Sequence, residues 1–149
     1  MKKFTLITVI TAAIAVAGCQ GSHSASDKVA MAEMVMAEND VVATRKICDG
    51  IMADSMTRKG LEATEMARLS ILYMELNERT DDHEAVDIAA DCYRDAFDID
   101  ADSARSFYDS LEPDRLKYAM ALSSIVSSMD NPNNLEDAGE HDHEFADSI

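Results

Sequence analysis

The sequence predicts an all-α protein, and three observations support this fold class. Apolar residues recur at three- and four-residue steps through most of the chain, which is the period of an α-helix. Residues that favour helices are abundant, and there are only two prolines and five glycines among 149 residues. No long alternation of Val, Ile and Thr indicates a sheet. We therefore expect about six helices, arranged as antiparallel hairpins.

Residues 1–18 have the pattern of an export signal. A Met-Lys-Lys start is followed by an apolar run over residues 4–15. This run is shorter than the ~20 residues that a spanning helix needs. It leads into Val-Ala-Gly-Cys, which ends at Cys19 and resembles the lipobox of bacterial lipoproteins. In that family the signal is removed and the cysteine is acylated on its sulfur and its amine, so the resemblance implies lipidation of Cys19. A plain secretory signal with a chance cysteine is the alternative.

The residues after Cys19 indicate a location and a domain organisation. Gln20 resembles the outer-membrane class of Gram-negative lipoproteins, so we expect a protein held to the bacterial outer membrane by its acyl chains and facing the periplasm. Residues 19–27, with their small polar side chains, are expected to be the lipidated cysteine and a flexible tether. The helical body is expected over residues 28–130. An acidic tail without fixed structure follows over residues 131–149.

Each helix of the body is predicted from its own spacing of apolar residues. The predicted elements are helices over residues 28–38 and 41–55, a turn over 56–60, a central helix pair within 66–99, and helices over 103–111 and 115–129. Asp81, followed by Glu84, has the form of a helix N-cap in the polar turn of the central pair. Pro113 suits the first turn of a helix.

The central pair resembles a tetratricopeptide repeat. Met66, Leu69, Ser70 and Tyr73 match the large, leucine, small and aromatic positions of the first helix of that family, and residues 89–97 match the second. Either the connection between the helices is several residues too long for the family or the second helix is extended by roughly a turn, and Ala101 replaces the usual proline. The resemblance implies a short solenoid of hairpins with one concave surface. A closed helical bundle is the alternative.

The same resemblance implies a function. Tetratricopeptide folds commonly bind peptides or helices in their concave face, so we expect a protein-binding adaptor or scaffold whose partner is another, unidentified envelope protein or peptide. The expected partner-contacting residues are Met66, Leu69, Ser70, Tyr73 and Tyr108.

The charge of the chain restricts the class of partner. Acidic residues outnumber lysine and arginine by 29 to 13, which gives a formal net charge of −16. Nucleic acid is excluded as a partner because phosphate binding needs a basic face. A basic or apolar partner is favoured. No motif for catalysis or nucleotide binding is found, so we expect no enzymatic activity, no catalytic residues and no cofactor besides the covalent lipid.

The remaining cysteines and the histidines of the tail are the other candidates for chemistry. Cys48 and Cys92 are expected to form a disulfide, as two leftover cysteines of an exported protein usually do. Two separate buried thiols are the alternative. His141 and His143 lie among carboxylates and are candidate ligands for Zn²⁺, Ni²⁺ or Cu²⁺. They support a second hypothesis, a periplasmic metal-binding lipoprotein. A structural lipoprotein with no dedicated ligand is the third.

Overall fold

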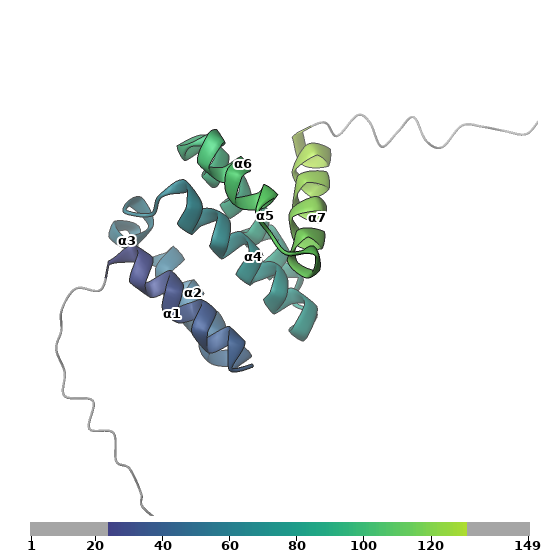
Figure 1. Ribbon diagram of the computed structural model, residues 1–149. Coiled ribbons are helices and arrows are strands. Elements are labelled where there is room, and N and C mark those ends of the chain that lie inside the picture. Colours follow the sequence, from purple (N-terminus) through teal and green to yellow (C-terminus); the bar gives the residue numbers. More distant parts are fainter. Residues whose placement is uncertain (1–23, 131–149) are drawn as a thin grey trace, which may run out of the picture.

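Seven helices and no strand make up residues 24–130, the part of the chain that this computed structural model describes (Figure 1). The all-α prediction is therefore confirmed. The predictions for Cys19, His141 and His143 lie outside the described residues, as do those for the signal and the tail. The helices are α1 (Ala25–Ala37), α2 (Val41–Ala53), α3 (Ser55–Lys59), α4 (Ala63–Thr80), α5 (His83–Ile99), α6 (Ala101–Asp109) and α7 (Pro113–Asp130).

The body begins earlier than the sequence predicts, because a capping box starts α1. The Ser24 hydroxyl accepts a hydrogen bond from the Asp27 backbone N–H at 3.2 Å, and the Asp27 carboxylate accepts one from the Ser24 N–H at 3.1 Å. This reciprocal pair satisfies two backbone donors at the helix start. Residues 24–27, predicted as the end of the tether, are thus the N-cap and first turn of α1.

A short helix replaces the turn predicted over residues 56–60. Asp54 caps α3, accepting hydrogen bonds from the Met56 N–H at 3.1 Å and the Thr57 hydroxyl at 2.6 Å. A carboxylate at this position satisfies donors that would otherwise face solvent. The last two helices, α6 and α7, each start two residues before their predicted positions, and Pro113 does occupy the first turn of α7.

The connection inside the central pair is short. Helix α4 continues to Thr80, and only Asp81 and Asp82 join it to α5. Asp81 has a left-handed backbone with φ of 55° and ends α4. Asp82 caps α5, since its carboxylate accepts from the Glu84 N–H at 3.1 Å. The predicted cap at Asp81 is therefore wrong by one residue.

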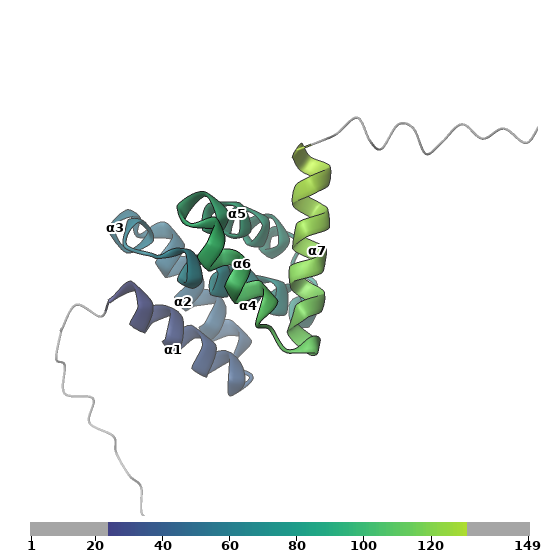
Figure 2. The same cartoon turned by 45° about the horizontal axis from the view of Figure 1, so that its top comes forward.

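Helix α4 is the centre of the molecule. Ten of its 18 residues are buried, including all of residues 69–74, which cover every side of the helix. A helix that is buried all round needs neighbours on all sides. Helices α1, α2, α5, α6 and α7 pack on it (Figures 1 and 2). The core of the protein is thus built around this one helix.

Six of the helices within residues 24–130 form three consecutive pairs, α1–α2, α4–α5 and α6–α7. α1–α2 and α4–α5 are antiparallel hairpins, as predicted. α6 and α7 diverge from their connection and pack mainly on α4 and α5, so the predicted third hairpin is open (Figure 2). Ion pairs join the units to α4: Arg68 binds Glu33 of α1 through both carboxylate oxygens, and Arg115 Nε of α7 lies 2.7 Å from Glu75.

Candidate binding groove

A groove runs between α2–α3 and α5, with α4 as its floor. Helices α2 and α5 have no extensive contact with each other, although both flank α4. Three hollows of about 640, 490 and 610 Å³ follow one another between them. The first two share Arg45 and Asp49, and the second and third share Arg58. We call this continuous depression the α2–α5 groove.

The two walls of the groove differ in charge. The cations that line it all come from α2 and α3, whereas the carboxylates come mainly from α5 and the residue that caps it. The cations are Arg45, Lys46, Arg58 and Lys59; the carboxylates are Asp49, Asp82, Glu84, Asp91, Asp95 and Asp98. Carboxylates therefore exceed cations in the groove, as they do in the whole chain.

Apolar side chains gather at the two ends of the groove. Val41, Val42 and Leu76 line the first hollow, and Val42 is 80% exposed. Met66 and Ile99 line the third hollow with Leu61, and Ile99 is 49% exposed. An exposed aliphatic side chain beside a hollow is a natural contact for an apolar side chain of a ligand.

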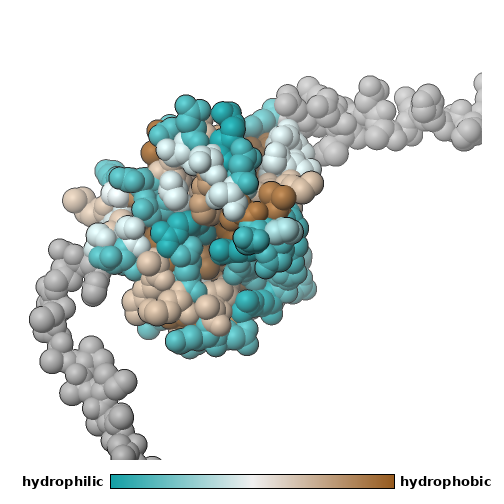
Figure 3. Space-filling view, in the orientation of Figure 1, coloured by the Kyte–Doolittle hydropathy of each residue, from teal (hydrophilic) through white to brown (hydrophobic). Residues whose placement is uncertain are grey.

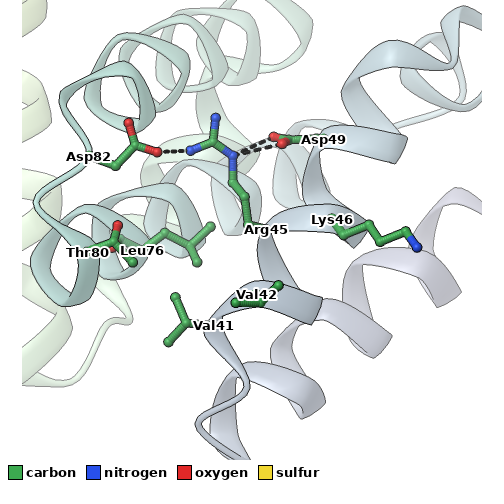
Figure 4. Close-up of a pocket in the computed structure, with 8 residues that line it drawn as sticks. All are labelled: Val41, Val42, Arg45, Lys46, Asp49, Leu76, Thr80 and Asp82. Atoms are coloured by element: carbon green, nitrogen blue, oxygen red, sulfur yellow. Dashed lines mark hydrogen bonds and ion pairs between the residues drawn. The ribbon is translucent and has the colours of Figure 1, made fainter.

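Arg45 bridges the walls near the first hollow (Figure 4). Its Nε donates to both oxygens of Asp49 at 2.8 Å, its Nη1 binds Asp82, and its Nη2 lies 3.4 Å from Glu84. The guanidinium is planar and carries several donors, so it can bind carboxylates on both sides. Burial lowers the pKa of Arg45, but the hydrogen bond of Asp49 and the charges of Asp49 and Asp82 outweigh this effect and raise it.

Tyr73 of α4, at the floor of the groove, contacts both Arg45 and Asp49. Its side chain is fully buried, and its hydroxyl donates to Asp49 Oδ1 at 2.9 Å. The Arg45 guanidinium carbon lies 5.7 Å from the centre of the Tyr73 ring, within range of a cation–π contact. Burial raises the pKa of Tyr73, and the negative charge of Asp49 adds to that effect, so the phenol stays protonated as a donor. The network joins α2, α4 and α5.

A second bridge crosses the groove between α3 and α5. Arg58 Nη2 lies 2.7 Å from Asp95 Oδ2, and this hydrogen bond raises the pKa of Arg58. Both side chains are more than a third exposed, at 44% and 34%. Solvent screens such a pair, so a ligand can displace it at little cost.

The residues expected to contact a partner are buried. Leu69, Ser70 and Tyr73 are 0% exposed, Met66 is 2% exposed and Tyr108 is 6% exposed. Met66 and Tyr73 do line the floor of the groove, but the other three do not. Ser70 and Tyr108 instead form a buried hydrogen bond of 2.9 Å between α4 and α6. Leu69, Ser70 and Tyr108 therefore pack in the core and form no partner surface, whereas Met66 and Tyr73 reach the floor of the groove.

The structure contains Cys48 and Cys92 as free, buried thiols, and the expected disulfide is not formed. The Cys92 thiol instead points at the thioether of Met52, with 3.8 Å between the sulfur atoms. Both cysteines are 0% exposed and belong to the hydrophobic core. They act there as small apolar side chains, which is the alternative given by the sequence.

We predict that Cys48 and Cys92 do not react with iodoacetamide in the folded protein, because burial raises the pKa of each thiol to about 12. Mass spectrometry after alkylation, with and without denaturant, measures this at each position. Dithiothreitol should leave the midpoint of unfolding unchanged, whereas a disulfide would contribute about 2–4 kcal/mol. A Cys48–Cys92 linked peptide in the purified protein would contradict the prediction.

Two further observations concern only the described helices. Within residues 24–130, no group of His, Cys, Asp and Glu side chains is placed to hold a metal ion. None of the helices in this range is both long and apolar enough to cross a bilayer.

The sequence analysis missed the groove and its bridging arginines. One local signal for Arg45 was present, since Arg45 and Asp49 have the i, i+4 spacing of a helical ion pair. Arg45 also lies one helical turn after Val41 and one turn before Cys48. It is therefore close to the apolar side of α2. Its other partners, Asp82 at the cap of α5 and Glu84 on α5, are 37 and 39 residues away, and no local pattern indicates them.

Comparison with known protein families, curated proteins and solved structures finds no match for this chain.

Proposed function

We propose that this chain is a lipid-anchored adaptor of the bacterial envelope that holds a segment of another envelope protein in the α2–α5 groove. The observation that carries the proposal is the groove itself, three joined hollows with apolar ends and charged walls. A groove between helices is a common site for an extended or helical segment.

The chemistry of the lining favours a segment that combines basic and apolar side chains. Six carboxylates and four cations line the groove, so a lysine or arginine of the ligand gains more than an acidic residue does. Glu84, with 77% of its side chain exposed, is accessible to such a cation. Val42 and Ile99 would contact apolar side chains at the two ends. Charge then sets specificity and the rate of association, while apolar burial supplies affinity.

Selection from a random peptide library, with the full acylated chain in detergent as the target, tests the groove. We expect enrichment of peptides that combine Lys or Arg with aliphatic residues. Val42→Gln should lower the affinity of a selected peptide by about tenfold, as loss of one apolar contact at the end of the groove does. Met120→Gln is the matched control, because Met120 is 67% exposed but lies on α7, outside the groove.

Two results would contradict the groove as the binding site. One is enrichment of acidic peptides. The other is an affinity that Val42→Gln and Met120→Gln leave equally unchanged. Glu84→Gln separates the charge contribution, since it should weaken binding of a basic peptide and reduce its dependence on salt.

The lipid anchor has its own test. The charged start, the apolar run and the Val-Ala-Gly-Cys sequence before residue 20 support acylation of Cys19. Mass spectrometry of the N-terminal peptide from cell membranes should show a chain that begins at an acylated Cys19. A Cys19→Ser variant should leave the membrane fraction. An unacylated N-terminus in the native protein would overturn this part of the proposal.

A further inference from the structure

Helix α1 presents an apolar face to solvent. Val29, Ala32 and Met36 are buried on its inner side, whereas Met31 and Met34 are 53% and 61% exposed on the opposite side. Two exposed alanines of α1 extend this surface, which we call the α1 outer face; its members are Ala30, Met31, Met34 and Ala37. Figure 3 shows a continuous tan, moderately hydrophobic area over α1.

The charged residues of α1 lie beside this face or at its ends. Glu33 is bound by Arg68 through both oxygens. The Lys28 ammonium donates to the Thr57 hydroxyl at 2.7 Å and lies 3.6 Å from Asp54. These contacts direct two of the charges toward the protein. Between Asp27 and Glu38, which are exposed at its two ends, the α1 outer face therefore meets solvent with methyl and thioether groups.

The length of the chain before α1 limits how far this face can lie from residue 19. Only four residues separate Cys19 from Ser24, the residue that caps α1. A fully extended chain spans at most ~3.3–3.6 Å per residue, so α1 begins within about 18 Å of Cys19. The helix is 13 residues long, or about 20 Å. An anchor at Cys19 thus keeps the start of α1 within about 18 Å of the bilayer and its far end within about 38 Å, so the helix can lie against the lipid.

We infer that the α1 outer face is a membrane contact, on which the body lies against the lipid headgroups. The inference rests on the proposed acylation of Cys19. Because the anchor already holds the protein at the bilayer, even a small apolar face contributes enough free energy to stay in contact with the lipid. The excess of acidic residues opposes an anionic surface, and the contact therefore suits zwitterionic lipid.

This orientation leaves the groove accessible. In Figure 1, α1 lies in front of α2, and α5 lies behind α4. The α2–α5 groove therefore opens on the side of the molecule away from α1. A protein lying on its α1 outer face can still bind a partner that approaches from the aqueous side.

Single-tryptophan variants test the contact, because the chain has no tryptophan. Met34→Trp places the probe on the α1 outer face. Val42→Trp is the matched control, since it lies at the same end of the α1–α2 hairpin, is 80% exposed and lines the groove. Both variants are purified from cell membranes and reconstituted into phosphatidylcholine vesicles with brominated acyl chains, which quench only tryptophan at bilayer depth.

We expect bromolipid to quench about half of the Met34→Trp emission, with a blue shift, and to leave Val42→Trp nearly unquenched, because an interfacial helix buries one face to the acyl boundary. Equal quenching of the two variants in vesicle-bound protein overturns the inference. If neither variant floats with vesicles and neither carries acyl chains, the acylation itself is wrong. Circular dichroism shows that both variants keep their helical content.

Discussion

Leu69→Ala is expected to lower the free energy of unfolding by about 2–5 kcal/mol, because it leaves a cavity in the middle of the core. Leu69 is 0% exposed on α4, which five other helices surround. Such a loss is a large part of the total stability of a small domain. Denaturant unfolding followed by circular dichroism measures it.

The result separates a core residue from a partner-contacting one. Met120→Ala is the control, because Met120 is 67% exposed and a surface change of this kind stays within about 0.5 kcal/mol. If Leu69→Ala were as mild as Met120→Ala, Leu69 would lie on a surface, and the arrangement of helices around α4 would be wrong.

Arg45→Met is expected to destabilise the protein by about 1–3 kcal/mol and to weaken binding in the groove. The change leaves Asp49, Asp82 and Glu84 facing one another without their shared cation. Breaking a fully buried pair costs about 3–5 kcal/mol. The Arg45 side chain is 23% exposed, so solvent screening reduces the expected loss.

Arg105→Met is the matched control for Arg45→Met. Arg105 is 63% exposed and pairs with Asp102, which is 95% exposed, so its removal should have little effect on stability. A double-mutant cycle between Arg45→Met and Asp82→Asn should show a coupling free energy of about 0.5–3 kcal/mol. Independent effects of the two changes would show that Arg45 does not join the walls of the groove.

Local patterns are sufficient to predict six of the seven helices within residues 24–130, all except α3. Three- and four-residue spacing marks α1, α2 and α4 to α7, because each of them packs at least one face. The predicted first and last residues of the helices are less accurate, because they depend on which side chain caps each helix. Ser24 begins α1 earlier than the apolar residues do, and Asp82 rather than Asp81 begins α5.

The binding surface could not be predicted in the same way. Spacing shows that Leu69 and Tyr73 share a face, but it does not show that α4 is covered on every side. The groove arises from contacts between residues far apart in sequence, such as Arg45 with Asp82 and Arg58 with Asp95. The Cys48–Cys92 disulfide was expected because exported proteins usually pair their cysteines. That argument gives no information about where the two side chains lie in the core.

Photo-crosslinking in intact cells tests the central claim most directly, with a photoreactive phenylalanine at Val42 in the groove and, in a separate strain, at Met120 outside it. We predict that Val42 forms a crosslink to one reproducible envelope protein, within a segment that combines basic and aliphatic residues, and that Met120 does not. Crosslinks that are the same at both positions, or that fall on an acidic segment, would contradict an adaptor that binds its partner in the α2–α5 groove.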